Sequence, residues 1–100
     1  MQDKYLIDII SKCYLWHKRL IKENELGITV TNAERLKVSK GIVEKIEKTA
    51  SFLTDEDYFI IYNEVIKGKE GHWYMGYLSD ATYYRHRRVA YQTFINYLNK

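Results

Sequence analysis

The chain has 100 residues, of which 46% are apolar, with ten tyrosines and no proline. This is the length of one domain with enough apolar side chains for a core. No run of about 18 apolar residues is present to span a membrane. The single cysteine, Cys13, excludes an internal disulfide and makes a reducing cytoplasm the expected location. Residues 1–4 include an acid and do not begin the hydrophobic block of a signal peptide.

The net charge of +3 is small, but it is unevenly placed along the chain. Residues 1–78 contain twelve basic and twelve acidic side chains, which balance. Residues 79–100 contain Arg85, Arg87, Arg88 and Lys100 against Asp80 alone. The last segment therefore carries the whole positive excess, and a concentrated positive field attracts phosphate better than a diffuse one.

A first helix is expected over residues 3–23, because apolar residues recur there at three- and four-residue spacing. They are Leu6, Ile7, Ile9, Ile10, Cys13, Tyr14, Trp16, Leu20 and Ile21. Within this set, Leu6, Ile10, Tyr14 and Trp16 either pack inside the chain, form a dimer seam or line a groove for a partner. The sequence does not decide between these alternatives. Gly27 is expected to end the unit, followed by Ile28, Thr29 and Val30 as an extended connector.

A second helix is expected to run from Thr31 to about Thr49. Thr31 and Glu34 fit the two ends of a capping box, with Thr31 as the N-cap. The buried side of this helix is expected to carry Leu36, Ile42, Val43, Ile46 and Ala50. Gly41 lies in its middle, where glycine costs about 1 kcal/mol relative to alanine and allows a close helix crossing.

A third helix is expected to start at Thr54, because three acidic residues follow this capping residue and favour a helix N-terminus. Residues 58–66 are almost all apolar, so this helix is expected to be buried on most sides. Residues 67–71 break it, and residues 72–78 form a short aromatic helix or turn.

The last helix is expected to start at the capping residue Ser79 and to run from Asp80 to about Leu98. Its later turns carry an apolar face made by Ala90, Phe94 and Leu98. The expected fold is an all-α compact bundle of four to five helices in one domain, residues 1–100. Within it, residues 1–52 form a helical N-terminal extension, and residues 53–98 form a half that is like a helix-turn-helix.

The C-terminal half also resembles a known family. A Leu-Thr-Asp-Glu start at residues 53–56 leads into an apolar helix, and a short aromatic element at 73–74 follows. The last helix then begins with Leu-Ser-x-x-Thr-Tyr-Tyr-Arg-x-Arg-Arg-x-Ala, residues 78–90. This order is similar to the helix-turn-helix of region 4 of sigma-70 factors. It is more similar still to sigma-like phage late-transcription activators and to small mollicute proteins of unknown role.

The resemblance implies a DNA-binding face on the last helix. It implies that Asp80, Ala81, Tyr84, Arg85 and Arg88 face double-stranded DNA, and their spacing does place them on one helical face. Arg85 would donate two hydrogen bonds to guanine, and Arg88, one turn later, would contact phosphate. Tyr84 would stack on a sugar or touch a thymine methyl. The resemblance leaves open a second contact, to RNA polymerase through the N-terminal helices.

Other positions of the motif are expected to pack inward. The resemblance implies that Leu78 closes the turn, that Thr82 and Tyr83 take the shoulder and first core position, and that Ala90 packs on the preceding helices. Arg87 departs from the pattern, which has an apolar residue there. Either the helix is rotated, with His86 and Ala90 on its inner face, or Arg87 extends past the edge of the core.

No catalytic site, metal or other cofactor is expected. Cys13 and His17 lie four residues apart on a helix, but no second pair of ligands accompanies them. There is no glycine-rich phosphate loop, nucleophile elbow or pair of catalytic acids, so the chain is not expected to be an enzyme. The capped basic helix and the resemblance to sigma region 4 instead make regulation of transcription by DNA binding the expected function. Two alternatives stay open: a merely solvated basic helix, and a protein-interaction module that no longer binds DNA.

Overall fold

The computed structural model describes residues 2–29 and 31–100, and this part of the chain is all-α with no strand. The expected fold class is confirmed. The elements are α1 (Gln2–Glu25), α2 (Ala33–Ser51), α3 (Asp55–Ile61), the π-helical segment η1 (Tyr62–Ile66) and α4 (Asp80–Leu98). No helix in these residues is both long enough and apolar enough to cross a membrane.

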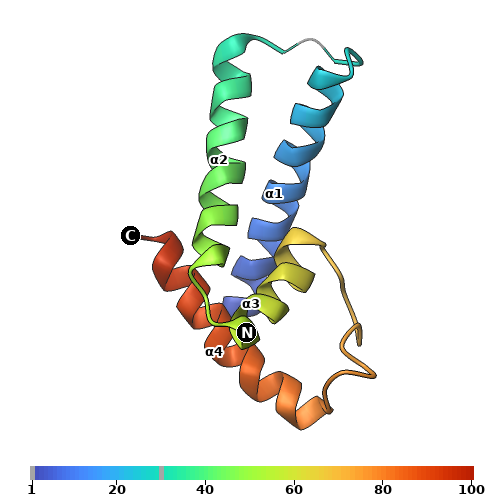
Figure 1. Ribbon diagram of the computed structural model, residues 1–100, viewed down its shortest axis with the longest axis vertical. Helices are drawn as coiled ribbons and strands as arrows, with labels where there is room; N and C mark the ends of the chain where they lie inside the picture. The colour runs from blue at the N-terminus through green and yellow to red at the C-terminus, as the bar shows by residue number, and fades with distance from the viewer. Residues whose placement is uncertain (1, 30) are drawn as a thin grey trace.

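The four helices form two unequal parts (Figure 1). Helices α1 and α2 are antiparallel and make a long hairpin, which we call the arm; residues 26–29 and 31–32 between them are the tip. Helix α3, η1 and α4 pack together against the opposite end of the hairpin, and we call them the body. The arm therefore projects away from the body, and the molecule is elongated, with extents of 46 × 29 × 24 Å.

The core lies where the base of the arm meets the body. Its most completely buried large side chains come from α1, α3, η1, α4 and the segment before α4, and are Ile7, Ile60, Ile61, Val65, Tyr74, Tyr91 and Phe94. From α2, Val43, Ile46 and Ala50 are buried as expected, while Leu36 and Ile42 are half-buried. Burial of these apolar surfaces is the main force that holds α4 against the rest of the chain.

The helix starts agree with the sequence at two positions out of three. Thr54 and Ser79 are the N-caps of α3 and α4, and their hydroxyls accept hydrogen bonds from the backbone N–H groups of Asp57 and Thr82, each at 3.3 Å. The prediction of Thr31 as the cap of α2 is wrong. The cap is Asn32, whose side-chain oxygen accepts from the Arg35 N–H at 2.8 Å. Asparagine caps at least as well as threonine, so adjacent candidates compete.

The tip is also not the extended connector that the sequence predicts. Gly27 has φ +75°, a left-handed conformation that folds the chain back over the end of α1. The N–H groups of Ile28 and Thr29 then both donate to the carbonyl of Glu23, so these residues form a bend. Val30, the third residue of the predicted connector, lies outside the described residues.

Residues 72–78 form consecutive turns, so of the two expected alternatives the turn is present. Hydrogen bonds from the N–H groups of Tyr77 and Leu78 to the carbonyl of Tyr74 tighten these turns directly before the cap of α4. The connection between η1 and α4 thus occupies residues 67–79, whereas a helix-turn-helix joins its helices by about three or four residues.

Candidate nucleic-acid interface

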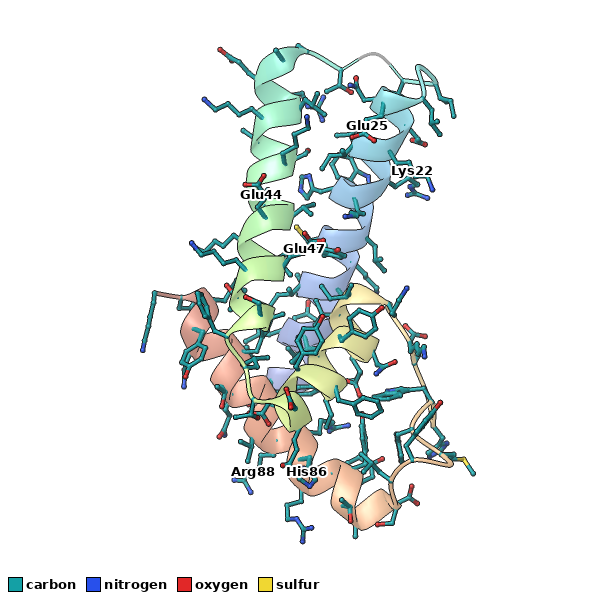
Figure 2. All side chains as sticks on the ribbon, viewed as in Figure 1. Lys22, Glu25, Glu44, Glu47, His86 and Arg88 are labelled. Carbon is teal, nitrogen blue, oxygen red and sulfur yellow. The ribbon has the colours of Figure 1, made fainter. Side chains whose placement is uncertain are left out.

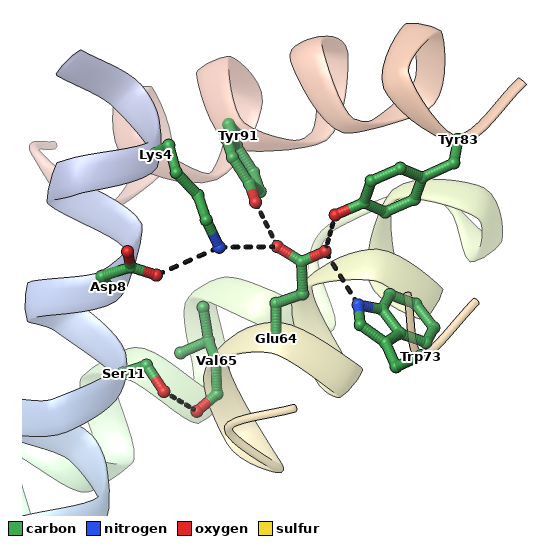
Figure 3. Close-up of polar contacts among 8 residues, drawn as sticks. All are labelled: Lys4, Asp8, Ser11, Glu64, Val65, Trp73, Tyr83 and Tyr91. Atoms are coloured by element: carbon green, nitrogen blue, oxygen red, sulfur yellow. Dashed lines mark hydrogen bonds and ion pairs between the residues drawn. The ribbon is translucent and has the colours of Figure 1, made fainter. Parts of the chain in front are cut away.

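Helix α4 is fixed by a buried carboxylate on its inner side (Figure 3). Glu64 of η1 has a side chain only 2% exposed. The hydroxyls of Tyr83 and Tyr91, both on α4, donate hydrogen bonds to its two oxygens, and the indole N–H of Trp73 donates at 3.0 Å. Lys4 Nζ of α1 lies 3.8 Å from Oε1. One carboxylate therefore joins α1, η1, the turn segment and α4.

The two tyrosine hydroxyls stay protonated as donors in this network. Burial raises the pKa of Tyr83 and of Tyr91 well above the usual value near 10, and the adjacent Glu64 carboxylate raises both further. A buried carboxylate without partners is very costly, and here both oxygens are satisfied. The network therefore specifies one position of α4 relative to η1.

Glu64 lies within the π-helical turn η1. The Lys67 N–H donates to the carbonyl of Tyr62, five residues earlier, so the turn is wider than an α-helical one. The Ser11 hydroxyl of α1 donates to the carbonyl of Val65 at 3.0 Å, which satisfies a backbone group inside this wider turn. Turns of this kind are frequent at functional sites.

The start of α4 is held by the aromatic turns before it. Tyr74 is 1% exposed and stacks on Tyr83, with ring centroids 3.7 Å apart and planes 8° apart. Its hydroxyl donates to the carboxylate of Asp80 at 2.8 Å. Asp80, which the resemblance implies to face DNA, is exposed but also fastens these turns to the first residue of α4.

Arg87 follows the second of its two expected alternatives. It is half-buried, and its guanidinium lies 4.9 Å from the Tyr84 ring centroid and 5.3 Å from that of Tyr91. Ala90 is fully buried on the inner face, as the resemblance implies, while His86 is half-buried and lies 3.5 Å from a carboxylate oxygen of Glu56. Arg87 thus extends past the edge of the core and covers tyrosine rings.

The outer face of α4 is open to solvent. Ala81, Tyr84, Arg85 and Arg88 are all exposed, Tyr84 by 50%. No acidic side chain among residues 2–29 and 31–100 lies within ion-pair distance of Arg85 or Arg88. Figure 2 shows Arg88 projecting away from the body. The inner face of α4 is thus fixed, while its outer face keeps two guanidinium groups available.

The structure adds residues to the candidate site that sequence reasoning did not single out. Glu64 is the most important, with Lys4 and Trp73 as two of its partners. A signal was present: Asn63 and Glu64 are the only polar, non-aromatic residues within the apolar run of residues 58–66. A charged residue inside such a run is either paired or functional.

His17, which the sequence offers as a possible metal ligand together with Cys13, makes a hydrogen bond between helices. His17 Nδ1 hydrogen-bonds the buried hydroxyl of Ser39 at 2.8 Å, which links α1 to α2. Among the described residues, no three His, Cys, Asp or Glu side chains come together to hold a metal ion.

Comparison with known proteins adds no relative to this description. The chain matches no protein-family model, and comparisons with curated proteins and with solved structures give no significant match.

Proposed function

We propose that this protein is a non-catalytic regulator of transcription that binds double-stranded DNA by placing the outer face of α4 in the major groove. The observation that supports this most directly is the exposure of Arg85 and Arg88 together on one face, without an acidic partner in the part of the chain that is described. An α-helix fits the major groove, where arginine pairs with the guanine edge.

In this proposal the residues of the outer face have separate tasks. Arg85 donates to guanine O6 and N7, while Arg88, about one turn further along, contacts a phosphate. Ala81 is small enough to let the helix approach the base edges, and Tyr84 contacts a sugar or a thymine methyl. Asp80 stays at the entrance of the helix with Tyr74. A cytoplasmic location goes with this role.

The fixed inner face supports the proposal energetically. A surface that binds without rearrangement loses less conformational entropy on binding than a mobile one. Tyr83 and Tyr91 attach α4 to Glu64, and Arg87 stacks on the tyrosine rings instead of reaching outward. The side chains of the outer face are therefore the ones that adjust to DNA.

The test is a mobility-shift assay on fragments of the source genome at low salt. Wild-type protein should shift duplex DNA, and the Arg85→Ala/Arg88→Ala variant should lose several kcal/mol, about 1–3 for each good contact. Lys37→Ala/Lys40→Ala is the matched control, because it removes two exposed cations from the arm. If wild-type protein binds no fragment even at low salt, the proposal is wrong.

A second candidate function is a protein-interaction module on the same fold. The observation that favours it is the segment 72–78, which forms turns where a helix-turn-helix has its supporting helix, and which exposes Met75 and Tyr77 by 68% and 72%. The partner of such a module would be a protein that contacts these exposed side chains. A wild-type protein that shifts no duplex DNA but still retains a protein partner on co-purification would favour this function over DNA binding.

A further inference from the structure

Helix α1 carries two apolar stripes, and only one of them is used inside the molecule. Ile7, Tyr14 and their neighbours face α2 and the body. The second stripe consists of Leu6, Ile9, Cys13, Trp16 and Leu20. Its alternating spacing of three and four residues is the spacing of a helix seam that packs against another helix. Leu6, Ile9 and Trp16 are 42%, 46% and 46% exposed, while Cys13 and Leu20 are half-buried, so most of this stripe is uncovered.

Helix α2 extends the same face of the arm. Trp16 and His17 of α1 line a groove together with Glu34, Arg35, Val38 and Ser39 of α2. Val38 is 61% exposed beside it. At the base of the arm, the C-terminal end of α4 borders α2. Above that border, no described part of the chain covers this face.

The two ends of this face carry different side chains. The tip end carries the acids Glu23 and Glu34 beside Arg19 and Arg35, with exposed Leu26 and Ile28 beyond them. The basal end is an open groove of about 600 Å³ between α2 and the end of α4. Cations and aromatic rings line it, and its residues are Lys45, Lys48, Thr49, Phe52, Tyr97 and Lys100.

We propose that this face binds a second copy of the chain in an antiparallel, two-fold symmetric arrangement. The tip of each arm, with exposed Leu26 and Ile28, lies in the basic, aromatic basal groove of the other copy. A two-fold interface requires a surface that is complementary to itself, and in an antiparallel arrangement individual acids of one copy meet individual cations of the other.

The register of the two helices supports the same two-fold axis independently. His17 of α1 and Ser39 of α2 lie at the same height along the arm, because their side chains are hydrogen-bonded at 2.8 Å. Glu23 lies six residues after His17, and Lys12 five before it, so an axis near His17 brings Glu23 opposite Lys12 of the second copy.

On α2, the same axis relates a second pair of opposite charges. Lys45 lies six residues after Ser39 and Glu34 five before it, so Glu34 comes opposite Lys45 of the second copy. One axis therefore pairs opposite charges on both helices, with Trp16 and Leu20 packed between them.

The test is the mass of the protein in solution over a concentration series, measured by sedimentation equilibrium. Wild-type protein should pass from one chain mass to two. Glu34→Lys alone, or Lys45→Glu alone, places like charges opposite each other at two symmetric positions and should raise the dissociation constant of the dimer about tenfold. The double variant Glu34→Lys/Lys45→Glu restores opposite charges and should return the dissociation constant close to the wild-type value.

Two further variants complete the test, with helical circular dichroism to confirm folding. Lys37→Glu is the matched control, because Lys37 lines a groove on the other side of α2 and should leave the dimer unchanged. Trp16→Ala should weaken the dimer more than tenfold. A protein that stays monomeric at every concentration would overturn the proposal and leave this face to a different partner. A dimer that is equally strong in all variants would place the contact elsewhere. Neither outcome depends on DNA binding, because the variants lie in α1 and α2.

Discussion

Two carboxylates in this molecule have the same kinds of partner but lie in very different surroundings. Glu64 in the body accepts hydrogen bonds from Tyr83, Tyr91 and Trp73 and lies near Lys4. Glu47 in the arm accepts from Tyr14 at 2.6 Å and from Lys18 at 3.2 Å. Their side chains are 2% and 43% exposed.

The difference shows how burial changes the value of the same chemistry. Water screens the charge of Glu47 and replaces its partners if they are lost, so the pair is worth little. Glu64 has no such replacement, so removing one part of its network leaves a buried charge or donor unsatisfied. The position of α4, and with it the proposed DNA-binding face, should therefore depend on Glu64 and hardly on Glu47.

The largest expected effect is that of removing the buried carboxylate. Glu64→Ala should lower the free energy of unfolding by about 3–5 kcal/mol, because the tyrosine hydroxyls, the indole N–H and Lys4 lose their shared acceptor. The matched variant Glu47→Ala should cost about 1 kcal/mol or less. Urea unfolding followed by helical circular dichroism measures both. If both variants lowered the free energy of unfolding equally, the burial of Glu64 would not make it more important for stability than Glu47.

Alkaline pH should unfold the protein by ionising four buried tyrosines, three in the body or the turns before α4 and one in the arm. Burial, followed by neighbouring carboxylates, raises the pKa of Tyr14, Tyr74, Tyr83 and Tyr91 in the folded chain. The folded state then holds protons that the unfolded state releases above about pH 10, so this stability is complete below pH 10 and is lost as the pH rises beyond it. In an absorbance titration, four of the ten tyrosines should ionise only at the pH at which the helical circular dichroism signal is lost. Full ionisation of all ten in a folded protein would contradict the network.

Acid pH should act on the arm, with a smaller effect. The hydrogen bond from Tyr14, together with the contact to Lys18, lowers the pKa of Glu47 in the folded state. The contribution of Glu47 is therefore complete above the usual glutamate pKa of about 4.3 and is lost as the pH falls through the lower folded value. Glu47→Gln should cost about 0.5–1 kcal/mol at pH 7, discounted for exposure, and much less at pH 3. A pH-independent difference would mean that the ionised form is not what stabilises the arm.

The smallest effect, and the only gain, is expected at Gly41 in the arm. The sequence suggested that this glycine allows a close helix crossing, but nothing lies within 4 Å of the position that a Cβ would take. Gly41→Ala should therefore raise the free energy of unfolding by about 0.5–1 kcal/mol through helix propensity alone. Thermal unfolding measures it. A loss of stability would indicate a contact at Gly41 that the isolated chain does not have.

Local signals predicted the helices well, because caps and periodicity depend on neighbouring residues. Thr54 and Ser79 cap α3 and α4, and α4 has the expected bounds. The cap of α2 was misplaced by one residue, since Thr31 and Asn32 are both capable caps. The two stripes of α1 were visible as apolar positions, but which stripe faces inward depends on where the body packs.

The candidate site also has one part that could be predicted from the sequence and one part that could not. The outward direction of Arg85 and Arg88 follows from helical spacing, so it could be predicted. The network that fixes α4 could not, because its members are Lys4, Glu64, Trp73, Tyr83 and Tyr91, which come together only in the folded chain. Charge alone also did not decide the role of Arg87, which stacks on tyrosines that α4 itself supplies.

The central claim, that the outer face of α4 binds duplex DNA, is tested most directly by the salt dependence of binding. Fluorescence anisotropy with a random-sequence duplex would compare wild-type protein, Arg88→Ala and the arm variant Lys37→Ala over a range of salt concentrations. We expect Arg88→Ala to reduce the slope of log K against log salt by about 1, because one phosphate contact is lost, and Lys37→Ala to leave it unchanged. The same slope for all three proteins, or no binding by any of them, would contradict the claim.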